Sequence, residues 1–231
     1  SDTLWLIWKE QDAETTTHIR AGLYKLGTGT WENGQLLYLA EGNDLVYYSD
    51  PTLIGLGNGA ILAFFSGINE TEKTQEIYWA ALGPLGVLKT RTLLDPLQGG
   101  SLDAAILADK VMLAWVTPDR GAVALNLLGL TGSGSSIDLV TGDTQLLTLE
   151  NLNLVEHISL FADQSNDGIL TWKNVDSTQM YYALVESSGV LRTPAVMFFR
   201  DPSAGIMVSK NGQSSTIYVG AYRLAMPFIS R

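Results

Sequence analysis

The feature that most restricts the fold of this chain is an internal repeat. Residues Gly86–Thr90 read Gly-Val-Leu-Lys-Thr, and residues Gly189–Thr193 return as Gly-Val-Leu-Arg-Thr. A weaker copy, Asp138–Thr141, lies about halfway between them. Two further series run in step with this one. One is aromatic, at Trp8, Phe65, Trp115 and Trp172, and the other is acidic, at Asp50, Asp103 and Glu156. The three series share a period of roughly 50–53 residues, which is typical of a repeat architecture.

Each repeat unit contains four short strands. In the clearest unit the strands are expected over residues 157–162, 169–174, 179–186 and 190–199, where β-branched and aromatic runs are separated by Gly, Asn and Asp. Four antiparallel strands in a unit of this length predict a blade of a β-propeller, because twisted four-stranded sheets can pack face to face around an axis. We therefore predict an all-β propeller that forms a single domain over residues 1–231. It has four to five units, at roughly 1–46, 47–98, 99–152, 153–202 and 203–231, of which the first and last are incomplete.

The segment 156–194 resembles the sialidase-like (BNR-type) repeats of bacterial surface β-propellers. Ser165, Asp167, Thr171 and Trp172 fit the Ser-x-Asp-x-Gly-x-Thr-Trp box of that family, whereas Ile169 replaces its glycine. The resemblance therefore implies the architecture, and with it an extracellular or cell-surface location in a bacterium. It does not carry over the sialidase site.

Charge and composition narrow the partners. The formal net charge is −10, and Lys and Arg do not cluster, so nucleic acid is not expected as a partner. No run of 18 apolar residues is present, so no membrane insertion is expected. The absence of cysteine excludes disulfides, thiolate catalysis and cysteine-ligated zinc.

The acidic series is the best candidate for a site. In a propeller, Asp50, Asp103 and Glu156 would start the innermost strands of successive blades, and His157 follows Glu156. Carboxylates that converge at one mouth of the axis can bind a hard cation or hydrogen-bond sugar hydroxyls. In the alternative interpretation each acid only caps a turn before its strand.

Two segments suggest more specific chemistries. Asp50-Pro51 resembles the Asp-Pro of five-bladed glycoside hydrolases, whose aspartate acts as base or nucleophile, with Asp103, Glu156 or Glu186 as the acid. Residues 163–168 resemble the first half of a calcium loop, but its twelfth position is Asn174 and not a glutamate. The prediction is accordingly no metal ligand and no cofactor, with Ca²⁺ as the only cation considered.

Aromatic residues are more numerous than four core positions require. Trp79 and Tyr182 lie at matching places in the third strands of their units. If exposed, such rings would stack on sugars or anchor a protein; if buried, they would pack between blades. The predicted ligand-binding set is Asp50, Asp103, Glu156, His157, Trp79 and Tyr182.

The sequence favours a non-catalytic extracellular or cell-surface module for adhesion, glycan binding or assembly. The alternative is a glycoside hydrolase or sialidase-like enzyme with carboxylates at the axial mouth. The expected partners are a glycan or a protein at a surface. Self-assembly through terminal strands is a further prediction, with residues 204–210 pairing with residues 4–9 in this chain or in a neighbouring copy.

Overall fold

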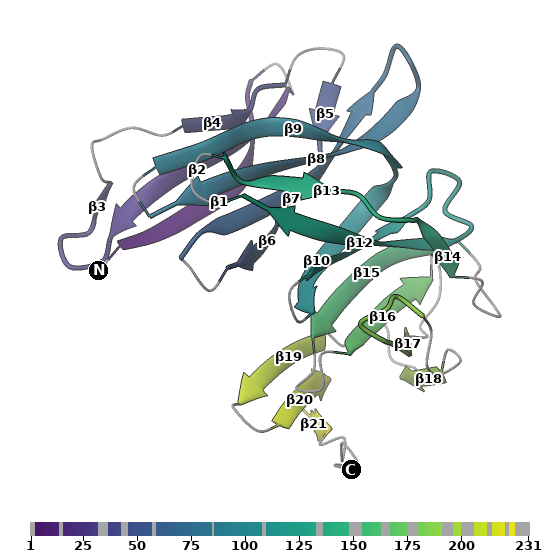
Figure 1. Ribbon diagram of the computed structural model, residues 1–231. Coiled ribbons are helices and arrows are strands. Elements are labelled where there is room, and N and C mark those ends of the chain that lie inside the picture. Colours follow the sequence, from purple (N-terminus) through teal and green to yellow (C-terminus); the bar gives the residue numbers. More distant parts are fainter. Residues whose placement is uncertain are drawn as a thin grey trace.

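The computed structural model of the chain describes most residues up to 199 and three short stretches beyond 205. The described ranges are 3–13, 16–31, 37–42, 46–56, 59–84, 86–107, 110–132, 136–147, 154–162, 167–174, 180–190, 196–199, 206–211, 214–219 and 222–224. Within them the fold is all-β, every sheet is antiparallel, and none closes into a barrel (Figure 1).

The described strands form five sheets that follow one another along the chain. Sheet A contains β1 (Thr3–Gln11), β2 (Thr17–Lys25), β3 (Thr30–Trp31) and β4 (Leu37–Ala40). Sheet B contains β5 (Val46–Tyr48), β6 (Thr52–Gly55), β7 (Ile61–Asn69), β8 (Thr74–Gly83) and β9 (Gly86–Gln98). Sheet C contains β10 (Gly100–Leu107), β11 (Lys110–Val116), β12 (Val123–Thr131), β13 (Asp138–Val140) and β14 (Gln145–Leu147).

The last two sheets are smaller. Sheet D contains β15 (Val155–Ala162), β16 (Gly168–Asn174), β17 (Met180–Val185) and β18 (Val196–Phe199). Sheet E contains β19 (Ile206–Asn211), β20 (Ser214–Val219) and β21 (Tyr222–Leu224). Sheets B, C and D share one order, in which four strand positions follow one another along the chain. The first position of sheet B is divided into β5 and β6, which both pair with β7, and the last position of sheet C into β13 and β14, which both pair with β12.

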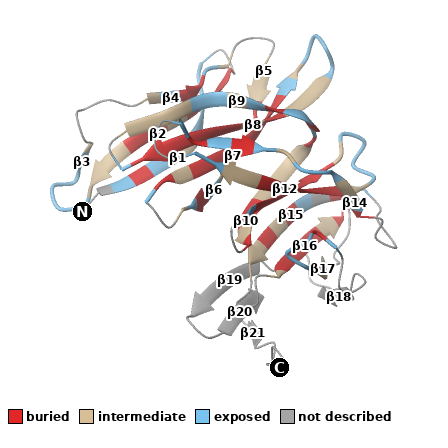
Figure 2. Ribbon diagram, in the orientation of Figure 1, coloured by how far each residue is buried: buried red, intermediate tan, exposed pale blue. Residues whose placement is uncertain are grey.

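Sheets A to D pack on one another in chain order through three apolar clusters. One joins A to B, one joins B to C, and one joins C to D. The alternation of strand β11 shows why: Val111, Leu113 and Trp115 face sheet B, whereas Met112, Ala114 and Val116 face sheet D. Successive strand residues point to opposite faces, so an unbroken apolar run covers both sides of a central sheet. Figure 2 shows the buried residues in red along these middle strands.

The aromatic series confirms the predicted register in three of its four members. Phe65, Trp115 and Trp172 lie in the second strands β7, β11 and β16, and all are buried. Each ring faces the preceding sheet: Phe65 faces A, Trp115 faces B and Trp172 faces C. Phe65 and Trp172 also stack on the tyrosines directly opposite them, Tyr78 and Tyr181.

The expected burial of Trp8 is wrong. Trp8 is only half-buried, because it points away from sheet B, and among the described residues no sheet precedes A. Trp5 is the buried indole of β1, and its Nε1 donates a hydrogen bond of 2.9 Å to the carbonyl of Gly83.

The expected pairing of the two termini within this chain is also not what the described strands do. β1 pairs with β2, and β19 pairs with β20 in a hairpin of its own sheet. Residues 204–205 lie outside the described residues, and pairing with a neighbouring copy stays a prediction.

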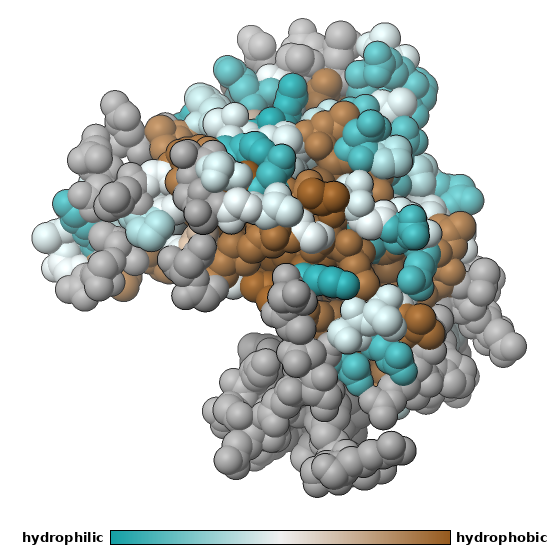
Figure 3. All heavy atoms as spheres, in the orientation of Figure 1, coloured by the Kyte–Doolittle hydropathy of each residue, from teal (hydrophilic) through white to brown (hydrophobic). Residues whose placement is uncertain are grey.

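On the face drawn in Figure 3, hydrophobic residues show between hydrophilic ones near the centre.

Candidate functional site

Asp103 is the side chain that joins the edge strands of three successive sheets. It lies on β10, and its Oδ1 accepts hydrogen bonds from the hydroxyl of Thr52 on β6 and from the backbone N–H of Ala104. Its Oδ2 accepts a hydrogen bond of 2.8 Å from the backbone N–H of Leu160 on β15. Both carboxylate oxygens are therefore engaged, and β6, β10 and β15 lie side by side around this group.

Strand register identifies the structural equivalents of Asp103. Thr52 is opposite Phe64, Asp103 is opposite Ala114, and Ser159 is opposite Thr171. In each case the next residue of the second strand is the repeated aromatic, Phe65, Trp115 or Trp172. Thr52, Asp103 and Ser159 thus occupy the same place in sheets B, C and D.

Asp50, Asp103 and Glu156 are therefore equally spaced in the sequence, but they do not occupy equivalent positions in their sheets. Asp50 comes two residues before Thr52, in the connection between β5 and β6. Glu156 comes three residues before Ser159, where the pairing of β15 with β16 shifts register. Sequence reasoning missed Thr52, and no spacing finds it: Thr52 comes 13 residues before Phe65, whereas Asp103 comes 12 residues before Trp115, so only the strand register makes them equivalent.

Asp50 is the exposed member of the group. Its side chain is 82% exposed, and its Oδ1 lies 3.0 Å from the Nζ of Lys9 on β1. The ion pair links sheet A to sheet B at the start of β6. Lys9 was not singled out in the sequence, because no repeat or motif contains it.

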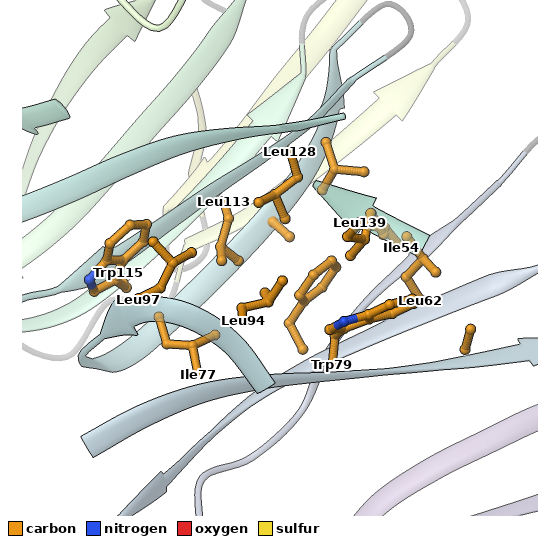
Figure 4. Packing of buried hydrophobic residues seen from close by; sticks show 14 of the residues in the cluster. Ile54, Leu62, Ile77, Trp79, Leu94, Leu97, Leu113, Trp115, Leu128 and Leu139 are labelled. Carbon is orange, nitrogen blue, oxygen red and sulfur yellow. The ribbon is translucent and has the colours of Figure 1, made fainter. Parts of the chain in front are cut away.

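The remaining candidates separate into accessible and buried groups. His157 is exposed and stands opposite Lys173 of β16, and Tyr182 is half-buried on β17 opposite Thr171. The side chain of Glu156 lies outside the described residues. Trp79 is 1% exposed in the cluster between sheets B and C (Figure 4). The Lys89 Nζ lies 4.7 Å from its ring centroid. Its ring is therefore not open to a ligand.

A second cluster of polar side chains joins β5, β8 and β9, and it includes Tyr78, which stacks on Phe65. The Arg91 guanidinium donates to the hydroxyl of Tyr48, and the hydroxyl of Tyr78 donates to the carboxylate of Glu76. Burial, followed by the hydrogen bond and negative charge of Glu76, raises the pKa of the Tyr78 phenol well above its ordinary value. The cluster holds strands together and presents no paired acid and base.

Metal binding has no protein ligand set in the described part of the chain, where no group of three or more His, Cys, Asp or Glu side chains could hold an ion. Residues 163–166 of the calcium-loop resemblance lie outside that part. The described residues also include no helix long and apolar enough to cross a membrane.

Comparisons with known proteins show a similar fold but no family for this chain. No family model matches the sequence, and the search of curated proteins finds no match. The solved structure of 1,3Gal43A, an exo-beta-1,3-galactanase from Clostridium thermocellum, is similar with a TM-score of 0.59 at 10% sequence identity. The similarity covers 95% of this chain and 52% of that one, so this chain spans about half the length of the galactanase structure.

A polysaccharide lyase, Uly1, aligns with a TM-score of 0.44 at 10% identity, covering 94% of this chain and 52% of that one. The galactanase shows that this all-β fold occurs in a carbohydrate-active enzyme. The resemblance to sialidase-like repeats remains an observation on the sequence alone, since the similar galactanase structure is not a sialidase.

Proposed function

We propose that this chain is a β-propeller module that binds glycans without cleaving them. The propeller is supported by the meander order of sheets B, C and D, each with four strand positions, by their face-to-face packing in chain order, and by the adjacency of their edge strands β6, β10 and β15. The shared fold with a galactanase supports a glycan as the ligand class. A secreted or cell-surface location belongs to the same proposal.

The observation that carries the non-catalytic reading is the engagement of Asp103. General acid–base hydrolysis of a glycoside needs two carboxyl groups that face the substrate across a gap of about 5–9.5 Å. Asp103 has the central position, but its oxygens accept hydrogen bonds from Thr52, Ala104 and Leu160. Three of the roughly four acceptor positions of this carboxylate are filled by internal donors, so Asp103 serves in this proposal to hold strands together.

The binding surface in this proposal surrounds the hydrogen-bonded carboxylate of Asp103. Three polar groups from three sheets lie at the surface beside β6, β10 and β15. They are the carboxylate of Asp50, which accepts hydrogen bonds, the ammonium of Lys9, which donates them, and the imidazole of His157. Sugar hydroxyls need such mixed donors and acceptors. A neutral glycan fits better than a polyanionic one, because the net charge of −10 repels anions.

Calorimetric titration with a panel of neutral oligosaccharides, including β-1,3-linked galacto-oligosaccharides, tests the proposal. We expect measurable binding and no release of new reducing ends on prolonged incubation. Asp50→Asn and His157→Ala should each weaken binding by roughly tenfold, about 1.4 kcal/mol, as expected for loss of one or two hydrogen bonds.

Glu72→Gln, an exposed acid in the turn between β7 and β8, is the matched control and should bind like the parent chain. Release of reducing ends that disappears in Asp50→Asn would instead establish the glycoside hydrolase alternative. The absence of binding to every sugar in the panel would refute the glycan as ligand.

A further inference from the structure

The hairpin between β7 and β8 carries the sequence motif of an N-linked glycosylation site at its tip. Asn69, Glu70 and Thr71 form an Asn-x-Thr sequon whose middle residue is not proline. No second Asn-x-Ser or Asn-x-Thr sequon occurs in the sequence, so any effect of the motif can be assigned to this position. A sequon serves only where the chain exposes it, and the place of Asn69 in the fold therefore decides its use.

The structure places the sequon at an exposed hairpin tip. Asn69 is the last residue of β7 and is opposite Thr74, the first residue of β8. The connecting residues 70–73 are all exposed. The tip projects at the top of Figure 1 and is coloured as exposed in Figure 2. A glycan at this position extends into solvent, so it is compatible with the fold whether it is attached before or after the chain folds.

The side chain of Asn69 is held with its carbonyl arm toward the backbone of the turn. Its Oδ1 accepts a hydrogen bond of 3.0 Å from the backbone N–H of Thr71 and one of 3.1 Å from the backbone N–H of Glu72. Only the oxygen of an amide can accept from two N–H donors, so these contacts identify the carbonyl arm. The Nδ2 atom, which receives the sugar in N-linked glycosylation, is therefore on the arm directed away from those two donors.

The sequon is well separated from the proposed glycan-binding surface. Thr52, which bonds to Asp103, is opposite Phe64, and Asn69 lies five residues farther along β7. A strand rises by about 3.3 Å per residue, which gives a separation of roughly 16 Å along β7. A sugar on Asn69 and a glycan bound near Asp103 would thus occupy different parts of the molecule.

We propose that Asn69 is an N-linked glycosylation site, and that its donor is an oligosaccharide carried on a polyprenyl pyrophosphate. In the transfer, Nδ2 forms a bond to the anomeric carbon of the first sugar while the bond from that carbon to the pyrophosphate oxygen breaks. The amide loses one proton, and the lipid pyrophosphate is the leaving group. A separate transferase catalyses this step, and this chain is its acceptor substrate.

This inference rests on the secreted or cell-surface location in the proposed function, because N-linked glycans are attached to chains of that class. It is independent of glycan binding by the chain itself.

Secretion of the full chain from a host that carries out N-linked glycosylation tests the inference. We expect most recovered chains to carry a glycan that a peptide-N-glycosidase removes, with conversion of Asn69 to aspartate detected by peptide mass spectrometry. Asn69→Gln and Thr71→Ala should each abolish the modification, whereas Thr71→Ser keeps the hydroxyl and should retain it. Glu72→Gln, which changes an exposed residue of the same tip outside the sequon, is the matched control and should be glycosylated like the parent chain.

Two results would overturn the inference. One is folded chain in the medium that carries no sugar at Asn69, and the other is a glycan that persists in Thr71→Ala, since attachment would then not depend on the sequon. Calorimetric titration of Asn69→Gln with the oligosaccharide panel keeps the two proposals apart. If the glycan is found at Asn69 but neither this variant nor the parent chain binds any sugar, the proposed glycan binding fails and the modification site stands.

Discussion

The carboxylate of Asp103 on β10 accepts a hydrogen bond from the hydroxyl of Thr52 on β6, and these two residues occupy the same register position in neighbouring sheets. The same carboxylate reaches the backbone of Leu160 on β15. One side chain thus fixes the spacing of edge strands that no backbone ladder joins. This arrangement gives the molecule a polar connection in addition to the apolar clusters between its sheets.

The first prediction concerns this connection. Asp103→Asn should lower the free energy of unfolding by about 1–3 kcal/mol, because an amide offers one acceptor oxygen and leaves a donor without a partner. Thr52→Val should cost about 1 kcal/mol on its own and much less in the Asp103→Asn background, since both changes remove the same hydrogen bond. Urea denaturation of the four proteins measures both values. Asp50→Asn, at an exposed position, should change stability by less than about 0.5 kcal/mol.

The second prediction concerns the repeated aromatic residues. Trp115→Ala should destabilise the chain by about 3–5 kcal/mol, because the ring is buried between sheets B and C and its Nε1 donates 2.8 Å to the carbonyl of Gln98. Trp8→Ala should cost less than about 2 kcal/mol, because its ring is only half-buried. Equal losses for the two variants in thermal or urea unfolding would contradict the assignment of Trp8 to an uncovered face.

The third prediction concerns close packing beside Trp115. A Cβ at Gly99 would lie 2.1 Å from the Trp115 Cδ1 and 2.5 Å from the carbonyl oxygen of Val116. Gly99→Ala should therefore destabilise the chain by about 1–3 kcal/mol, since neither the bonded indole nor the backbone can move away cheaply. Gly55→Ala, where the added Cβ meets nothing within 4 Å, is the control and should stay within about 0.5 kcal/mol.

The fourth prediction is a loss of stability at alkaline pH. The pKa of Tyr78 is raised in the folded chain by burial and then by Glu76. The unfolded chain therefore releases this proton from about pH 10 upward while the folded chain retains it. The contribution of Tyr78 to stability is fully present below pH ~10 and is lost as the pH rises above it. The loss reaches at most about 1 kcal/mol at pH ~11, because solvent screening weakens the effect for this partly exposed group.

Tyr78→Phe isolates this effect, because it removes the titrating hydroxyl and keeps the ring that stacks on Phe65. The difference in unfolding free energy between pH ~8 and pH ~11 should be smaller for the variant than for the parent chain. An identical difference in both proteins would show that the Tyr78 phenol titrates normally.

Much of the fold follows from patterns that are local in sequence. The alternation Val111-Met112-Leu113-Ala114-Trp115-Val116 specifies a strand with two buried faces, because neighbouring side chains point to opposite sides. The period that relates Phe65, Trp115 and Trp172 predicted three second strands, each carrying a ring buried between sheets. Both signals depend on backbone geometry and on spacing along the chain, so they can be read without knowing which sheets touch.

Only the tertiary structure decided the roles of the individual candidates. Asp50 and Asp103 look alike in sequence, yet one is exposed beside Lys9 and the other bonds Thr52 and Leu160. Trp79 could have been a ligand platform, but the stacking of sheet C on sheet B buries it. Trp8 carries the same repeat signal as Trp115, but it is only half-buried, because no sheet of the described residues packs on its side of sheet A. Burial and hydrogen bonding at these positions depend on contacts between strands far apart in the chain, which spacing alone does not specify.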